Sequence, residues 1–144
     1  MTKDVLISIS GLQFAGGENS EPVEVITSGS YYKKNGRHYI LYDEVAEDTA
    51  GNIIKLGDEV LDITKRGETN VHMMFEKDKK NVTYYYTPYG NLLIGIDATK
   101  VQVEETEHNL SVKVDYALEV NYEHMADCKI TMNIQSKNAG DFKI

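Results

Sequence analysis

The sequence predicts an all-β protein, a single antiparallel up-and-down β-barrel with little or no helix. Apolar and polar residues alternate along much of the 144-residue chain, almost no stretch has the helical period, and turn-forming residues recur at short intervals. These turns divide the chain into about ten strands, which must close into a barrel or stack as a sandwich because open sheet edges invite aggregation. Long strands joined by short links favour the up-and-down barrel.

The alternation is clearest between Leu110 and Tyr122, where every second residue is a leucine, valine or tyrosine. Side chains point to opposite faces along a strand, so this pattern predicts a long strand with one buried and one wet face. The same pattern marks three more expected strands, within Val5–Ile9, Val71–Phe75 and Ile130–Ile134.

The turns predict how neighbouring strands pair. Asn35-Gly36 is a strong hairpin signal, because a type I′ turn needs positive φ at both central residues. We therefore expect Val23–Lys34 to pair with Arg37–Val45. Thr87–Gly90 matches a type I turn with proline at its second position, which predicts a hairpin corner. The apolar face changes phase near Asp97–Thr99, so a bulge there should supply curvature for closure.

Length and composition bound the class of protein. The chain fits one domain over residues 1–144, with residues 137–144 expected as a short C-terminal tail. Cys128 is the single cysteine, so no disulfide can form within the chain, which favours a reducing, cytoplasmic setting. We recognise neither a signal peptide nor a membrane-spanning run, so no membrane partner is expected.

The charge argues against a nucleic-acid partner. The chain has 23 acidic against 15 basic residues and a net charge of -8, whereas binding to a phosphate backbone needs a clustered basic surface. The nearest basic cluster lies within residues 77–80, and it is interpreted as a solvated hairpin tip.

Motifs for catalysis are absent from the sequence. It has no nucleophile elbow, no phosphate-binding glycine loop and no His-Glu-x-x-His motif. The four histidines lie in different segments without metal-ligand spacing, and Cys128 is interpreted as structural because it has no evident base beside it. We therefore expect no cofactor and no metal, and an enzyme is the least favoured class.

Two acidic residues on the third expected strand raise an open question. Asp43 and Glu44 point to opposite faces, so they cannot act as an acid and base pair. By parity Glu44 lies with Tyr42, Ile40 and His38, and either face could point inward. A buried carboxylate needs a partner, for which Arg66 is the candidate. The pair would be structural, or it would anchor a ligand's polar group.

Tyrosine is the favoured aromatic residue, with ten tyrosines against three phenylalanines and no tryptophan. Buried tyrosines need hydrogen-bond partners and could line a cavity, but ordinary strand propensity and filling of the barrel are the favoured explanation. Tyr84 and Tyr86 share one face of their strand and Tyr85 takes the other. Which of these faces a cavity stays open.

Five short motifs follow one another along the chain: Gly29-Ser30-Tyr31-Tyr32, Tyr42-Asp43-Glu44, Arg66-Gly67, Met74-Phe75 and Tyr86-Thr87-Pro88-Tyr89-Gly90. With this set the chain resembles the YwiB-like bacterial proteins of unknown function. The resemblance covers most of the chain, from the first strand to about Gln135, and it implies a calycin-like barrel, related in shape to lipocalins, and a cytoplasmic bacterial setting. It implies no established activity. Without tryptophan, the chain cannot carry the lipocalin Gly-x-Trp signature, so no ligand carries over.

Two binding functions therefore lead. The first is a non-catalytic barrel that holds a small, largely apolar ligand inside or at its mouth; the second is a protein-interaction module with a filled interior. An open interior cavity would favour the first, and a packed interior with an exposed apolar patch would favour the second. Oligomeric state is left undetermined. The candidate ligand-binding residues are Tyr42, Glu44, Arg66, Tyr84 and Tyr86.

Overall fold

The structure is a computed structural model that describes residues 3–12, 23–43, 51–65, 71–87 and 90–137. These residues form ten strands and contain no helix, which confirms the all-β prediction. The strands are β1 (Asp4–Leu12), β2 (Val23–Lys34), β3 (Arg37–Asp43), β4 (Gly51–Gly57), β5 (Val60–Lys65), β6 (Val71–Glu76), β7 (Lys79–Thr87), β8 (Gly90–Glu105), β9 (Asn109–Val120) and β10 (Glu123–Ser136).

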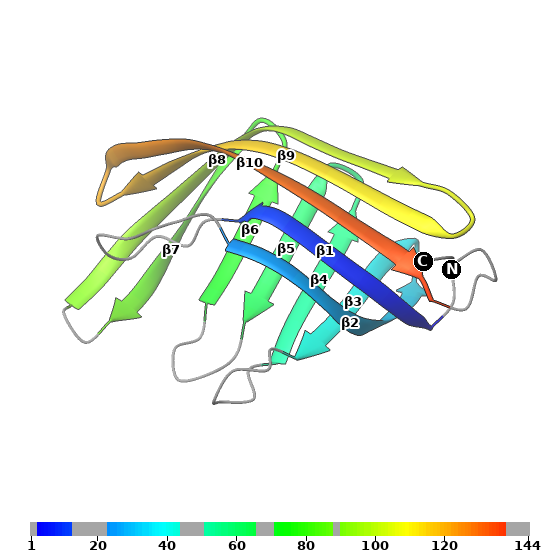
Figure 1. Cartoon of the computed structure of the whole chain (residues 1–144). Coiled ribbons are helices and arrows are strands. Elements are labelled where there is room, and N and C mark those ends of the chain that lie inside the picture. The colour runs from blue at the N-terminus through cyan, green and yellow to red at the C-terminus, as the bar shows by residue number, and fades with distance from the viewer. Residues whose placement is uncertain (1–2, 13–22, 44–50, 66–70, 88–89, 138–144) are drawn as a thin grey trace.

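All ten strands belong to one antiparallel sheet that curls into a nearly closed barrel (Figure 1). The order is β6-β5-β4-β3-β2-β1-β10-β9-β8-β7, so sequential strands are neighbours and β1 pairs with β10. Because β1 and β10 join the two ends of the chain, β6 and β7 remain as the edges of the sheet. The predicted up-and-down barrel is therefore confirmed.

The predicted turns are found where the structure describes them. Asn35 and Gly36 have φ values of 52° and 76°, as a type I′ turn requires, and Ser30–Lys34 pairs with Arg37–Leu41. Thr87 pairs with Gly90, so the hairpin corner is confirmed. Residues 88 and 89 of that corner, and the expected end of β3 at residue 45, lie outside the described residues.

The predicted bulge in β8 is also confirmed. The register between β8 and β9 shifts between Ala98 and Lys100. Inward-facing residues change phase across this point, from Ile96 and Ala98 to Val101. The bulge lets one long strand follow the curved wall while it keeps apolar side chains inside.

Nine of the ten strands, all except β7, contribute described side chains from one face to a common apolar interior. On β3 the buried residues are His38, Ile40 and Tyr42, which settles the parity question: this set faces inward. Glu44 lies outside the described residues.

The described part of the interior is packed. Its 25 buried apolar side chains have exposed fractions of at most 7%, and Val5, Ile40 and Leu56 have none. A side chain without accessible surface borders no space that could admit a water molecule. Aromatic rings meet inside the barrel, where Phe75 contacts Tyr116 edge to face with ring centroids 4.9 Å apart.

A seam separates the two edge strands. Only the turn at Lys77 and Asp78 connects β6 to β7, and no ladder pairs them within the described residues. The turn's amides bond elsewhere: Lys77 N–H donates to the Glu59 carbonyl (3.1 Å) and Asp78 N–H to the Ala98 carbonyl (2.8 Å). Figure 1 shows β6 and β7 running apart from this turn. The solvated tip is confirmed, but the strands that it joins do not form a hairpin ladder.

A close approach at Gly29 bends β2. The strand passes from its pairing with β1 to its pairing with β3 at Ser30. A Cβ atom at Gly29 would lie 2.5 Å from Ile7 Cδ1 and 2.5 Å from the Leu41 carbonyl oxygen. Only a residue without a side chain fits without a shift of the β3 backbone.

Replacing Gly29 by alanine should therefore destabilise the barrel by about 1–3 kcal/mol, the usual cost of overpacking. Urea unfolding of Gly29→Ala and the wild type measures this difference. Gly51→Ala is the matched control, because no atom lies within 4 Å of the added Cβ. Equal unfolding free energies for the two variants would contradict the packing described at Gly29.

Candidate functional site

Among the predicted ligand-binding residues, the structure describes the side chains of Tyr42 and Tyr84, which lie on opposite faces of the barrel wall. Tyr42 is buried in the interior with 6% of its surface exposed. Tyr84 is 64% exposed and pairs with the outward-facing Leu93, so it lies on the outer face and contributes nothing to an interior site. The period of two along β7 gives Tyr84 the same face as the exposed Val82.

The side chains of the other three predicted residues are not described. Glu44 and Arg66 lie outside the described residues. Tyr86 is placed in β7 opposite Asn91, but its side chain is not described. Binding of a small ligand by this set therefore stays a prediction.

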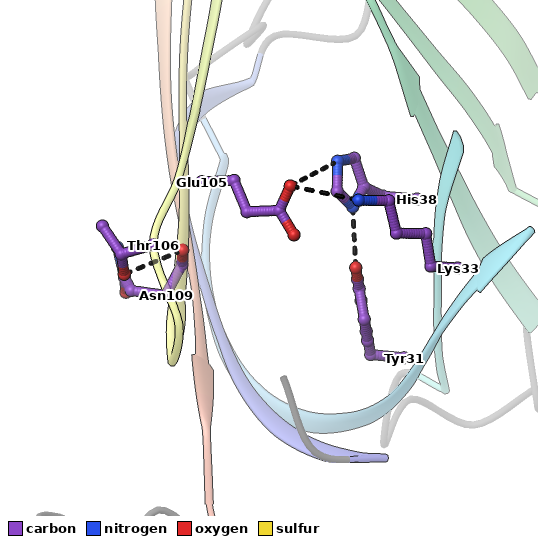
Figure 2. Close-up of polar contacts among 6 residues, drawn as sticks. All are labelled: Tyr31, Lys33, His38, Glu105, Thr106 and Asn109. Atoms are coloured by element: carbon purple, nitrogen blue, oxygen red, sulfur yellow. Dashed lines mark hydrogen bonds and ion pairs between the residues drawn. The ribbon is translucent and has the colours of Figure 1, made fainter. Parts of the chain in front are cut away.

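A polar cluster that the sequence analysis missed lies at the end of the barrel with the β2–β3 and β8–β9 turns. It consists of Tyr31 and Lys33 on β2, His38 on β3 and Glu105 at the end of β8 (Figure 2). The Tyr31 Oη atom lies 2.7 Å from His38 Nδ1. Glu105 Oε1 lies 3.3 Å from Lys33 Nζ and 3.8 Å from His38 Nε2. Because β8 is not a sheet neighbour of β2 or β3, Glu105 links opposite walls of the barrel.

Burial keeps His38 and Tyr31 neutral at neutral pH. Burial lowers the pKa of His38 below its ordinary value, although Glu105 opposes the shift. Burial, with a smaller contribution from Glu105, raises the pKa of Tyr31. The phenol therefore stays protonated and donates to His38 Nδ1, which leaves the Nε2 proton directed at Glu105. The contacts of Glu105 with Lys33 and His38 tie the β2–β3 hairpin to β8.

His38 should make the protein less stable in mild acid. In the unfolded chain a histidine has a pKa of about 6.5, so with a lower folded pKa the unfolded state binds more protons below neutral pH. The unfolding free energy should therefore fall as pH drops through about 6.5 towards the folded pKa.

We expect this loss to be smaller in His38→Gln, which cannot be protonated. Urea unfolding at several pH values measures it, with His124→Gln as the control because His124 is exposed beside Asp127. The cluster as described would be contradicted if His38→Gln and the control kept the same pH dependence as the wild type.

The other candidates for chemistry are dispersed. Cys128 is buried, and burial raises the pKa of its thiol, partly offset by a hydrogen bond with Tyr116. His72 pairs with Asp62 at 2.8 Å and His124 pairs with Asp127 at 2.9 Å, both on the outer surface. Over the described ranges, no group of three or more histidine, cysteine and acidic residues gathers in a way that could hold a metal.

The outer surface of the barrel carries several exposed large apolar side chains. Four of the six exposed large apolar side chains in the described ranges lie on β7 or at the β9–β10 hairpin: Val82, Tyr84, Tyr122 and Met125. The half-buried Leu93 links these two elements, because it pairs with Tyr84 and hydrogen-bonds through its backbone to Asn121. We call these five apolar residues, Leu93 included, the outer apolar set.

These features define a small antiparallel β-barrel with a packed interior in its described part and apolar side chains exposed along one outer region. The chain belongs to the family described as "Domain of unknown function (DUF1934)", whose sequence model matches residues 7–132. A search of curated proteins finds no match.

Among solved structures, the chain is similar to one titled "Crystal structure of ywiB protein from Bacillus subtilis". The two share 18% sequence identity with a TM-score of 0.71, and the match covers 94% of this chain and 93% of that one. This likeness supports the barrel fold and carries no activity with it. The described residues contain no helix that could cross a membrane.

Proposed function

We propose that this protein is a non-catalytic interaction module that binds another protein through the outside of its barrel. The packing of the interior carries the proposal. A barrel that encloses an apolar ligand has to leave accessible surface on the side chains that touch it. Here the described interior apolar side chains of β1–β6 and β8–β10 are almost completely buried against one another.

The outer apolar set supplies the second support. Scattered single apolar residues are normal on a surface, but a group that follows two linked elements indicates a contact region. One member also has an unusual backbone: Tyr122 has a φ of 69°, in a region that non-glycine residues rarely adopt, and its side chain is 79% exposed. Keeping an exposed tyrosine at such a position costs stability, which is consistent with a selected role in binding.

The cytoplasmic setting of this proposal is supported by the single cysteine, Cys128, which is buried and so does not expose a thiol to solution. A net charge of -8 supports a protein partner over a nucleic acid.

Native mass spectrometry of the protein purified from its own cells tests the proposal. The expected spectrum contains the bare chain and a complex with a second, different polypeptide, and Tyr122→Ser or Tyr84→Ser should reduce the complex. A small molecule retained in equal stoichiometry by the wild type and both variants would overturn the proposal, because it would place an occupied site inside the barrel.

A further inference from the structure

We infer that the outer edge of β7 at Val82 and Tyr84 receives an extended segment of another polypeptide as an additional strand. The inference rests on the proposed function and specifies the chemistry of the partner. Three observations carry it: the backbone alternation along β7, the splayed β6–β7 seam, and the exposed side chains of the edge.

The direction of the β7 backbone groups follows from Leu93. Its N–H donates to Asn121 Oδ1 at 3.0 Å, and its carbonyl accepts from Asn121 N–H at 2.8 Å. Both groups are therefore directed at the β9–β10 hairpin and not at β7. In an antiparallel ladder, hydrogen-bonded and non-hydrogen-bonded pairs alternate. The pair of Tyr84 with Leu93 is thus non-hydrogen-bonded, and the N–H and carbonyl of Tyr84 point away from β8.

By the same alternation, the N–H and carbonyl of Val82, two residues earlier, also point away from β8. Neither residue takes part in a backbone hydrogen bond beyond the β7–β8 ladder among the residues that the structure describes. Two N–H donors and two carbonyl acceptors are therefore presented to the seam. An edge of this kind is a template for an added strand.

On the opposite side of the seam, β6 also directs backbone groups at the seam. Lys77 N–H donates to the Glu59 carbonyl, so the odd-numbered residues of β6 bond towards β5. The backbone groups of Met74 then face the seam. Because β6 and β7 diverge from their turn, they cannot satisfy each other's groups along their length (Figure 1).

These groups select an extended polypeptide as the occupant. Backbone donors and acceptors that recur every second residue, about 6.8 Å apart, match the repeat of another strand. The exposed side chains of Val82 and Tyr84 would pair with apolar side chains of that strand. Lysine and proline blunt many sheet edges. On β7 they occur only at the two ends, as Lys79 and Lys80 at the start and Pro88 directly after it, and residues 81–87 contain neither.

A selection with phage-displayed, cysteine-free linear peptides of about ten residues, a typical strand length, tests this inference. The key variant is Val82→Pro, which removes a seam-facing donor and leaves the β7–β8 hydrogen bonds in place. Val82→Lys is a second edge variant that keeps the donor and blocks the edge with charge. The matched control is the double variant Tyr122→Ser/Met125→Ser, which alters exposed apolar residues away from this edge.

We expect enriched peptides whose affinity falls at least about tenfold in both edge variants and is unchanged in the control. N-methylation of every second amide of the peptide should abolish binding when it removes the N–H groups that face β7. It should leave binding intact when it removes the N–H groups on the other edge of the peptide. Peptides weakened only by the Tyr122→Ser/Met125→Ser control would overturn the edge inference and leave the proposed interaction function standing. Failure to enrich any peptide over Val82→Pro would also overturn the inference.

Discussion

Truncation of Phe75 to alanine is expected to destabilise the protein by about 3–5 kcal/mol, the range for a phenylalanine deleted from a packed core. Phe75 is completely buried on β6 and meets Tyr116 edge to face inside the barrel. Removal of its ring leaves a cavity that the stiff walls of strands cannot fill, so the cost of the void adds to the lost burial.

Urea unfolding measures this loss, and Tyr84→Ala is the matched control. Tyr84 is also an aromatic residue in a strand at the seam, but it is 64% exposed, so its truncation should change stability by about 0.5 kcal/mol or less. Benzene sharpens the test, because an apolar cavity of this size binds it. Benzene should stabilise Phe75→Ala and leave the wild type unchanged. A loss below about 1 kcal/mol in Phe75→Ala would show that the ring already borders open space.

The second large loss of stability is expected from replacing Gly11, which lies on β1 beside its neighbour β10. Gly11 has a φ of 86°, and an added Cβ would lie only 1.9 Å from the backbone carbonyl oxygen of Lys129. The register of β1 with β2 shifts between Ser10 and Leu12, so the glycine forms an irregularity in the strand that joins β1–β6 to β7–β10. Both the backbone conformation and the space exclude a side chain.

Gly11→Ala should therefore lose about 2–5 kcal/mol, from backbone strain of about 1–2 kcal/mol and an overpacking cost of about 1–3 kcal/mol. Gly11→Asn separates the two costs: asparagine tolerates positive φ, but its Cβ meets the same carbonyl. Thermal or urea unfolding of both variants, with Gly51→Ala as the control, measures the losses. If both Gly11 variants matched the control, the close approach to Lys129 would be refuted.

Much of the fold could be predicted because it depends on local patterns. The period of two between Leu110 and Tyr122 specifies a strand and its buried face without knowledge of its neighbours. The Asn35-Gly36 turn and the phase change near Ala98 are likewise local signals, and both were confirmed.

The candidate sites could not be predicted in the same way, because they depend on residues that are distant in the sequence. Glu105 contacts Lys33, which is 72 positions away in the sequence, and no local pattern near either residue predicts the contact. The seam was missed for a related reason. The turn at Lys77 resembles an ordinary hairpin turn, and only the three-dimensional structure shows that its amide is already bonded to Glu59.

The position of Tyr84 shows what the alternation of side chains along a strand can and cannot predict. The sequence established that Tyr84 and Tyr86 share a face, but the direction of that face depends on the pairing of β7 with β8. The structure moves Tyr84 from an interior ligand site to an outer edge. Its proposed role in binding survives with a different partner and through different atoms.

Residue-resolved amide hydrogen exchange along β7 tests the central claim most directly, since it needs no partner. The backbone alternation predicts rapid exchange at Val82 and Tyr84, whose amides face the seam, and slow exchange at Asn81 and Thr83, whose amides bond to β8. This two-residue alternation is the expected result. Equal protection at Val82, Thr83 and Tyr84 would contradict the claim, because the edge would then already be paired and could not receive another strand.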